Sequence, residues 1–400
     1  MQLTGGYPFW LIQDGLINSY PKLSKNIETN TVIIGGGISG ALTAYYLINA
    51  GIECVLVDGR TIGLGSTCAS TSLLQYELDE PLHLLKKKVG DKKAERAYQL
   101  CGKSIDELID VMNDLGFTEY ERTESLFYST HRSDKKFIQR EFEARKNAGF
   151  DVDVLSSNGI KKEYGLQAEY AILSQQGCTT NAYALTHALL QHSIKKGLQV
   201  FDRTCIASIQ YKKNTSLTTI DGFTIHAKNI INATGYEVVN FIPKNIVDLY
   251  CTYAIISEQK DTIENDCWKN NVMMWSTDDP YLYMRLTKDK RIIVGGRDER
   301  FSNKFTREIL IEKKSKQLQI DFHKILPEII FKKEFAWSGT FGKTKDSLPY
   351  IGAYKKTPNT YYALGFGGNG ITFSVIAAQI LCDIVCGKSN PDARMFAFDR

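Results

Sequence analysis

The pattern of hydrophobic and polar positions is clearest between residues 31 and 58, where three elements follow in close succession. A β-branched run, Thr31–Ile34, predicts a buried strand that ends in glycines. Ile38–Ala50 carries apolar residues at helical spacing, and Gly51 follows it as a helix C-cap. Glu53–Asp58 is a second apolar run with the character of a buried strand. Together these segments predict one right-handed βαβ unit with a glycine-rich turn after its first strand.

The rest of the chain is less regular. We expect residues 1–30 to form an irregular arm, and residues 84–150, which are charged and helical, to form an insertion away from the first unit. Short alternating runs between residues 198 and 225 predict a small antiparallel excursion, and residues 250–300 are rich in predicted strands. Further expected elements are the helices Asp91–Leu115, Asn181–Lys196 and Thr306–Leu326, the strands Ser125–Tyr128, Asn229–Gly235 and Tyr361–Leu364, and a last helix reaching Ile384.

Composition and charge narrow the class of protein. A chain of 400 residues, 43% of them hydrophobic, is long enough for two globular domains and too apolar to be disordered. A net charge of +4 without a basic stripe argues against nucleic-acid binding. No apolar run predicts a membrane span, and no secretory signal is visible at the start. Nine cysteines without a CxxC pair favour free thiols in a reducing cytoplasm, and no histidine spacing suggests a metal site.

The glycine-rich turn after the first strand fits the GxGxxG dinucleotide fingerprint at Gly35, Gly37 and Gly40. The first glycine permits a tight turn, the second lets the backbone approach a pyrophosphate, and the third allows close packing of helix and strand. Asp58 lies 18 residues beyond Gly40, close to the spacing at which an acid accepts hydrogen bonds from a ribose. The alternative is a glycine-rich turn that binds nothing.

Three later segments favour FAD over a nicotinamide cofactor. Gly63–Thr67 offers small residues and hydroxyls after the second strand, and Ala233–Gly235 ends a late strand where backbone can pass close to a pyrophosphate. Gly365–Thr372 begins the final helix, whose N-terminus would stabilise negative charge on a reduced flavin. Each segment alone is typical of a tight turn, but their joint occurrence in this order favours FAD. A plain nicotinamide dehydrogenase would leave the start of the final helix without a role.

At this point the chain resembles the FAD-dependent oxidoreductases of the D-amino-acid oxidase, glycine oxidase and sarcosine oxidase type. Asp346–Gly352 and Gly365–Gly370 are general marks of that family. The segments that look most like the γ-glutamylputrescine oxidase branch are Pro8–Leu11, Gly63–Ser66, Tyr283–Leu286 and Gly295–Arg297. The resemblance extends from about Tyr7 to the C-terminus and is weaker in the middle of the chain.

The resemblance implies an α/β fold with a discontinuous, Rossmann-like FAD-binding domain of the glutathione-reductase type. That domain would comprise residues 1–83, 151–248 and 335–400, and an α+β substrate domain with a large antiparallel sheet would comprise residues 84–150 and 249–334. The residues expected to bind FAD are Gly35, Gly37, Ile38, Ser39, Gly40, Asp58, Gly59, Arg60, Gly65, Ser66, Thr67, Ser70, Ile206, Ala233, Thr234, Gly235, Gly339, Gly367, Gly368, Asn369, Gly370, Ile371 and Thr372.

The activity implied by the resemblance is oxidation of the C–N bond of a small amine or amino acid. A hydride would pass to flavin N5, the imine would be hydrolysed, and dioxygen or another acceptor would reoxidise the flavin. Trp337–Phe341 lacks the cysteine, and the loop containing Cys68 lacks the histidine, that bind flavin covalently in relatives, so we expect non-covalent FAD. Ile293 stands where sarcosine oxidases use a lysine to assist oxygen, which favours a dehydrogenase over an oxidase.

Four residues are candidates for the substrate side of the site. Arg285, between apolar neighbours on a strand, could clamp a carboxylate, or be a solvated strand arginine. The same alternatives hold for Arg297, while Tyr283 could bind substrate or pack, and Lys343 could lie near the flavin or in a loop. Two other functions stay open: an FAD enzyme of this fold acting on a larger or non-amine substrate, and a non-catalytic FAD-binding protein. The oligomeric state is not predicted.

Overall fold

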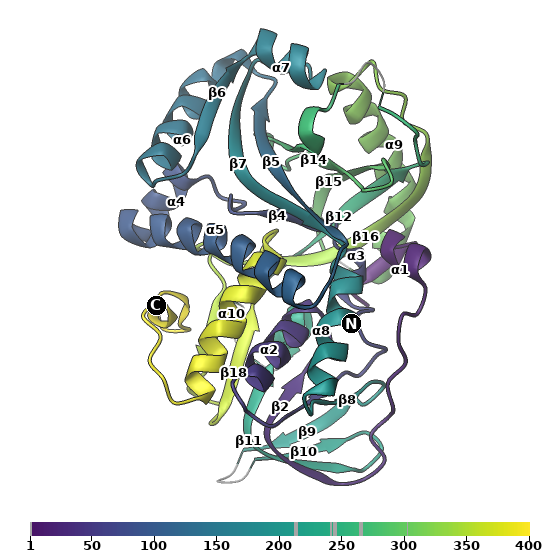
Figure 1. Cartoon of the computed structure of the whole chain (residues 1–400), viewed down its shortest axis with the longest axis vertical. Helices are drawn as coiled ribbons and strands as arrows, with labels where there is room; N and C mark the ends of the chain where they lie inside the picture. Colours follow the sequence, from purple (N-terminus) through teal and green to yellow (C-terminus); the bar gives the residue numbers. More distant parts are fainter. Residues whose placement is uncertain (1, 212–214, 241, 243–245, 264–266, 302) are drawn as a thin grey trace.

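The computed structural model describes residues 2–211, 215–240, 242, 246–263, 267–301 and 303–400. In this part of the chain the strands form two sheets, one in each half of the molecule in the view of Figure 1. Helices α2, α8 and α10 lie against the sheet of the lower half, and α5 lies between that group and the sheet above.

The eight-stranded sheet contains the predicted βαβ unit. Its main path runs in the order β17-β18-β11-β2-β3-β8, and the strands from β18 to β8 are parallel. β17 is antiparallel to β18, while β9 and β10 extend from β11 as antiparallel strands. The strands are β2 (Ile27–Ile34), β3 (Cys54–Val57), β8 (Gln199–Phe201), β9 (Ile206–Gln210), β10 (Thr215–Thr219), β11 (Thr224–Asn232), β17 (Tyr350–Ala353) and β18 (Thr360–Leu364).

The ten-stranded sheet follows the order β1-β16-β12-β15-β14-β13-β5-β7-β4, with β6 paired to β7. Its neighbours are antiparallel except for the pair β13 and β5. The strands are β1 (Thr4–Gly6), β4 (Leu73–Gln75), β5 (Tyr120–Ser129), β6 (Val152–Ser156), β7 (Tyr170–Thr180), β12 (Asp248–Ser257), β13 (Met273–Ser276), β14 (Tyr283–Leu286), β15 (Ile292–Arg300) and β16 (Lys333–Lys343).

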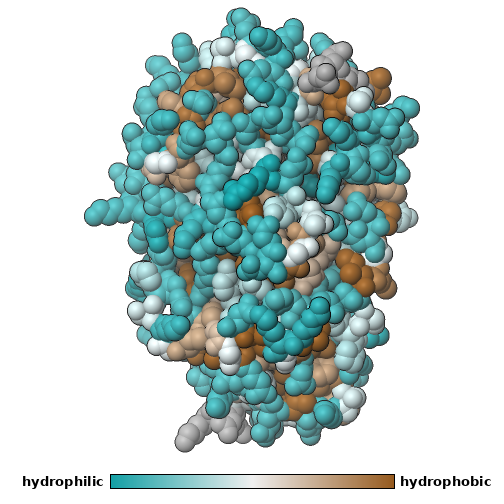
Figure 2. Space-filling view, viewed as in Figure 1, coloured by the Kyte–Doolittle hydropathy of each residue, from teal (hydrophilic) through white to brown (hydrophobic). Residues whose placement is uncertain are grey.

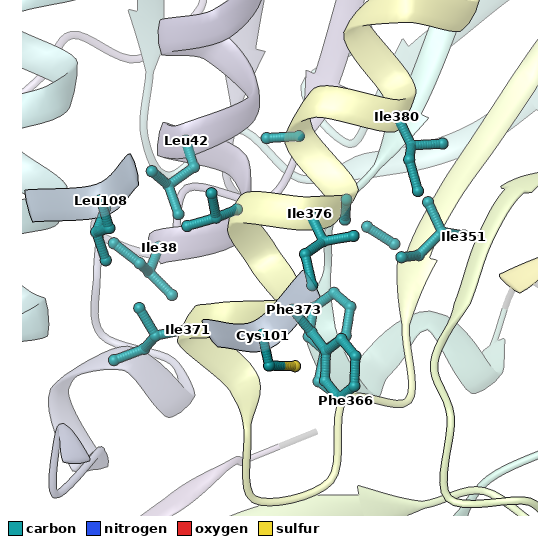
Figure 3. Packing of buried hydrophobic residues seen from close by; sticks show 14 of the residues in the cluster. Ile38, Leu42, Cys101, Leu108, Ile351, Phe366, Ile371, Phe373, Ile376 and Ile380 are labelled. Atoms are coloured by element: carbon teal, nitrogen blue, oxygen red, sulfur yellow. The ribbon is translucent and has the colours of Figure 1, made fainter. Parts of the chain in front are cut away.

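The largest hydrophobic core forms where α2, α5 and α10 meet. Figure 3 shows Ile371 of α10 beside Ile38 of α2, which lies next to Leu108 of α5, and Ile380 of α10 beside Ile351 of β17. Such contacts hold α2, α5 and α10 together, because burying each aliphatic side chain stabilises the fold by about 1.5–3 kcal/mol. The helices are α1 (Phe9–Asp14), α2 (Ile38–Asn49), α3 (Ser66–Ala69), α4 (Leu82–Val89), α5 (Asp91–Asp114), α6 (Lys135–Asn147), α7 (Ser157–Tyr164), α8 (Ala182–Lys195), α9 (Lys304–Ile325) and α10 (Gly370–Val385).

The structure corrects three expectations about the less regular segments. The N-terminal arm is not irregular, because β1 joins the edge of the ten-stranded sheet and α1 buries Phe9 and Trp10. β8 belongs to the parallel sheet through its pairing with β3 rather than to an antiparallel excursion. The runs predicted separately at residues 223–225 and 229–235 form one strand, β11, which pairs with β2 over its whole length.

Sheet pairing also bears on the predicted division into domains. β6 and β7, which the prediction assigns to the FAD-binding part, pair with each other and with β5 in the ten-stranded sheet. Leu126 of β5 lies opposite Leu173 of β7, so buried apolar pairs on one face select this register. β1, β4 and β16 belong to the same sheet. We therefore propose that the substrate domain begins near residue 73 and includes β7, with the FAD-binding domain resuming at α8.

The surface is mostly hydrophilic on the face shown in Figure 2, with hydrophobic residues in small separate patches. None of the helices in the described ranges has the length and apolar character that crossing a membrane requires. This matches the absence of a long apolar run in the sequence.

Candidate active site

A cavity of about 580 Å³ is lined by residues of both sheets. From the eight-stranded sheet it takes the turns that follow β2, β3 and β11, and from the ten-stranded sheet it takes residues of β12, β14, β15 and β16. The N-terminal end of α10 completes the lining. Ligands of open α/β sheets bind at the carboxyl ends of parallel strands, and the turns after β2, β3 and β11 lie at such ends.

The turn after β2 has the geometry of a pyrophosphate cradle. Gly35 has a φ of +112° and follows the end of the strand, and a Cβ there would lie 2.4 Å from the carbonyl oxygen of Ala233. A Cβ on Gly40 would lie 1.9 Å from the carbonyl oxygen of Gly35, so only glycine lets α2 approach β2 this closely. Gly37 is the N-cap of α2 and lines the cavity with Ile38. The free N–H groups at this helix end are suited to phosphate oxygens.

Asp58 follows β3 and lines the same end of the cavity. Its two carboxylate oxygens accept backbone N–H groups of Gly36 and Arg60, each at 2.7 Å. Burial raises the pKa of Asp58, and the two backbone hydrogen bonds and the Arg60 guanidinium oppose that rise. The Arg60 side chain is itself paired with Glu237 at 2.6 Å. Each carboxylate oxygen retains a lone pair for a ribose hydroxyl, the contact that the fingerprint predicts.

The short helix α3 lies against the cradle. Thr67 accepts a hydrogen bond from the backbone N–H of Ile38 at 3.1 Å, which ties α3 to the start of α2. The buried Cys68 thiol points to the carbonyl oxygen of Gly65 at 3.3 Å and is not part of the cavity lining. Burial raises the pKa of the Cys68 thiol to about 12, so it stays protonated. This geometry supports the expectation of a non-covalently held flavin.

The start of α10 lies at another wall of the cavity, which Gly367, Gly368, Gly370 and Ile371 line. Gly370, the first residue of α10, lines the cavity, so the partial positive charge of the helix N-terminus lies at the cavity wall. A helix end in this position stabilises negative charge on a bound group. The carbonyl and N1 edge of a reduced flavin is such a group.

Most of the residues predicted to bind FAD line this one cavity. Three do not. Gly40 is covered by the carbonyl of Gly35, Asn369 donates hydrogen bonds to the carbonyl oxygens of Gln75 and Glu77, and Thr372 bonds back to Asn369. The predicted residues in the lining are Gly35, Gly37, Ile38, Ser39, Asp58, Gly59, Arg60, Gly65, Ser66, Thr67, Ser70, Ile206, Ala233, Thr234, Gly235, Gly339, Gly367, Gly368, Gly370 and Ile371.

At the end of the cavity formed by the ten-stranded sheet, Tyr283 is the one predicted substrate residue that lines the wall. Its hydroxyl lies 3.1 Å from the hydroxyl of Thr252 on β12. Gly295 lies opposite Tyr283 in the pairing of β14 with β15, and a Cβ there would be 2.3 Å from the tyrosine ring. Gly295 therefore allows the ring to lie flat across the sheet and reach the cavity.

A β-bulge decides which side chain of β15 faces the cavity. Cys251 pairs with Glu299 but Tyr253 pairs with Gly296, so β15 carries one extra residue at this point. Arg297 takes a φ of +57° there. Strict alternation would place the side chain of residue 297 on the cavity face, like that of residue 295. The bulge shifts the alternation of side chains between the two sheet faces by one residue. Asp298 therefore lines the cavity instead.

Arg297 points to the opposite face and forms a bidentate ion pair with Asp321 of α9, with both N–O distances at 2.6 Å. Its predicted role beside a substrate is thus not what the structure shows. The sequence left Arg297 open between a substrate contact and a solvated strand arginine, because a bulge cannot be recognised from period-two alternation.

Asp298 is a candidate that the sequence analysis missed. Its Oδ1 atom is buried and has no hydrogen-bond partner in the described part of the chain. The pKa of Asp298 is raised from 3.8 to about 6, mainly by burial and to a smaller extent by Asp79 and Asp279, while Thr252 and Lys343 act in the opposite direction. A partly buried carboxylate with one oxygen free of hydrogen bonds, lining a cavity, is suited to a cationic ligand.

Arg285 lies on the same sheet face as Tyr283 but is covered. Its guanidinium donates to the carbonyl oxygens of Ser72 and Thr180, at 2.8 and 3.1 Å, and lies over the ring of Trp10. It is absent from the cavity lining. Burial lowers the pKa of Arg285 to about 10. The structure thus gives Arg285 a role in joining α1, β4 and β7, and no contact with a substrate carboxylate.

Lys343, at the end of β16, lies outside the main cavity and lines a neighbouring one. Its ammonium group lies over the rings of Tyr250 and Phe341, 5.3 and 5.5 Å from their centroids. The sequence left Lys343 open between a place near the flavin and a loop, and the structure places it beside the second cavity, close enough to lower the pKa of Asp298.

The glycine-rich turn after β2, the ribose-binding carboxylate of Asp58 and the N-terminus of α10 fit a flavin dinucleotide. Together with the fold they define an FAD-dependent oxidoreductase. Comparison with known proteins agrees: residues 30–384 match the FAD dependent oxidoreductase family, DAO. The chain belongs to this family, as its resemblance to the amino-acid oxidases indicated.

Individual relatives are distant in sequence but match over nearly the whole chain. The chain is 23% identical to a putative Rieske 2Fe-2S iron-sulfur protein of Bacillus subtilis, covering 96% of this chain and 73% of the relative. It is 21% identical to gamma-glutamylputrescine oxidoreductase of Escherichia coli, covering 93% and 87%. The structure matches L-proline dehydrogenase from P. horikoshii with a TM-score of 0.77 at 19% identity, covering 94% and 97% of the two chains.

Proposed function

We propose that this enzyme oxidises the C–N bond of a small amine held between bound FAD and the cavity wall formed by Thr252, Tyr283 and Asp298. The observation that carries the proposal is the continuity of one cavity from the dinucleotide fingerprint to these three residues. Distant relatives include gamma-glutamylputrescine oxidoreductase and glycine oxidases, which supports the same reaction class.

The protein's own residues have defined tasks in this proposal. Bound FAD supplies the acceptor for a hydride from the substrate carbon, after which the imine is hydrolysed and dioxygen or another acceptor takes the electrons. An amine donates hydride only when neutral, so the ammonium form must first lose a proton. Asp298 holds the ammonium group and accepts that proton, because its carboxylate has a free oxygen and a raised pKa. Tyr283 and Thr252 orient the substrate.

A pH profile tests the role of Asp298. As pH falls through about 6, Asp298 takes up a proton and can no longer accept one from the substrate, so flavin reduction should slow. We expect the Asp298→Asn variant to lose this inflection and to reduce flavin about 100-fold more slowly at neutral pH, the usual contribution of a positioned base. Anaerobic stopped-flow absorbance from about pH 5 to 9 measures both.

Thermal stability separates a catalytic role from damage to the fold. The pKa of Asp298 is higher in the folded chain than its ordinary 3.8, so the folded state binds the proton more tightly. Stability therefore falls as the pH rises from about 3.8 through about 6, and at neutral pH Asp298→Asn should melt at an equal or higher temperature. A variant that melts lower, or that keeps the wild-type rate, contradicts the assignment.

A further inference from the structure

A second cavity, of about 340 Å³, adjoins the first, and Tyr281, Phe366 and Gly367 line both. Its walls combine aromatic rings with carboxylates. The rings include Phe127, Phe137, Trp275 and Tyr281, and the carboxylates are Asp79, Glu80, Asp278 and Asp279. Trp275 stacks on Phe127 with ring centroids 4.1 Å apart, and Tyr281 meets the Trp275 ring edge-on at 6.0 Å. Aromatic faces beside carboxylates are the surroundings that amine cations prefer.

The charge around this cavity is not balanced from within. Glu80 pairs with Lys88 at 2.5 Å, and Asp278 lies 3.1 Å from a ring nitrogen of His131. Asp279 is exposed and has neither a hydrogen bond nor an ion pair in the described ranges. Among the described residues that line this cavity, Lys343 is the single lysine or arginine.

Asp79 stands where the two cavities meet. It accepts hydrogen bonds from the Tyr281 hydroxyl at 2.8 Å and from the backbone N–H of Gly368 at 2.9 Å. Asp79 and Asp279 both raise the pKa of Asp298 in the main cavity. The three carboxylates therefore mark a negative path from the solvent-exposed Asp279 to the reacting end of the site.

The main cavity lacks what a carboxylated substrate needs. Carboxylates are bound by arginine or lysine, and Arg60 is the single such residue that the described part of the chain contributes to the lining. Arg60 lies at the nucleotide end and is paired with Glu237. Arg285, the residue expected to clamp a carboxylate, is bonded to backbone carbonyls instead. An amino-acid carboxylate would thus lie beside Asp298 with no compensating cation.

We infer that the substrate is a diamine or polyamine without a carboxylate, with its reacting amino group beside Asp298 and a second cationic group in the aromatic and acidic second cavity. This inference rests on the proposed function and narrows its substrate. The two cavities would hold the two cations at once. The exposed carboxylates of Asp278 and Asp279 in the second cavity would attract the substrate from solution.

A matched set of compounds tests the inference on the purified FAD-loaded enzyme. Putrescine, n-butylamine and γ-aminobutyrate share a four-carbon chain and differ in the far end, which is a cation, a methyl group or a carboxylate. Anaerobic flavin reduction gives the half-saturating concentration of each. We expect that of putrescine to be about tenfold lower than that of n-butylamine, the effect of one cation held by aromatic rings and carboxylates, and that of γ-aminobutyrate to be the highest.

Variants connect this preference to the second cavity. Asp278→Asn combined with Asp279→Asn should raise the half-saturating concentration of putrescine several-fold more than that of n-butylamine. The control is Asp153→Asn, an exposed carboxylate of β6 outside both cavities, which should preserve the ratio. Calorimetric titration of putrescine into enzyme whose flavin has been reduced with dithionite gives the same comparison as binding, because no turnover takes place.

The outcomes separate the inference from the proposed function. If γ-aminobutyrate, glycine or proline reduces the flavin at lower concentration than putrescine, the inference is wrong and the proposed function stands. If no amine reduces the flavin, the proposed function fails, and calorimetry decides the cation site. Putrescine binding that weakens in the double variant of Asp278 and Asp279 then supports the cation site in the second cavity. Absence of putrescine binding overturns that site.

Discussion

Replacing Gly40 with alanine should strongly weaken FAD binding. The added Cβ would lie 1.9 Å from the carbonyl oxygen of Gly35, a backbone atom that cannot rotate away. Relief of this overlap must separate α2 from β2, and the atoms that move are those of the pyrophosphate cradle. Overpacking of this kind costs about 1–3 kcal/mol or more, which corresponds to about a five- to 150-fold weaker FAD complex. Equilibrium dialysis or flavin fluorescence after adding FAD to the apoprotein measures the loss.

The matched control for Gly40→Ala is Gly159→Ala. Gly159 lies within helix α7, and a Cβ there would find its nearest neighbour at 3.8 Å, an ordinary contact. Alanine favours a helix more than glycine does, so this variant should retain its flavin and gain slightly in stability. If Gly40→Ala purifies with a full complement of FAD, the cradle does not bind the cofactor as described.

Replacing Arg145 with leucine should cause the largest loss of stability. Arg145 of α6 is fully buried, with Nε bonded to Glu141 at 2.7 Å and a second nitrogen 3.3 Å from Glu77. Its guanidinium lies over the ring of Phe127, which lines the second cavity. Burial raises the pKa of Glu77, and Arg145 counters that effect. Without the arginine two buried carboxylates lose their shared partner, a change that costs about 3–5 kcal/mol.

Urea denaturation followed by far-ultraviolet circular dichroism measures this effect in the FAD-loaded protein. Arg140→Leu, an exposed arginine on the same helix, is the control and should change the free energy of unfolding by less than about 0.5 kcal/mol. Equal midpoints for the two variants would show that the buried carboxylates do not depend on Arg145.

The dinucleotide half of the site was predictable because its parts are close in sequence. The strand, turn, helix and acid lie between residues 31 and 58, and the physical demands on Gly35, Gly40 and Asp58 are local ones. Four helices were also predicted well, as α2, α5, α8 and α9 agree with the predicted helices within a few residues. Family resemblance then ordered the remaining glycine-rich segments.

The substrate half was not predictable residue by residue, because long-range pairing decides it. Thr252, Tyr283 and Asp298 meet only once β12, β14 and β15 are aligned, and the bulge in β15 exchanges Arg297 for Asp298 at the cavity. Arg285 was left open between a carboxylate clamp and a solvated strand arginine. However, Trp10 of the N-terminal arm and the backbone at Ser72 and Thr180 cover it, and nothing local to β14 reveals that.

The most direct test of the account is the visible spectrum of the purified protein under anaerobic conditions while amines are added one at a time. We predict a yellow flavin band that at least one small amine bleaches as the flavin is reduced. A flavin band that dithionite bleaches but no amine or amino acid affects would contradict amine oxidation while leaving FAD binding intact. Protein that carries no flavin and takes up none when FAD is added would contradict the central claim itself.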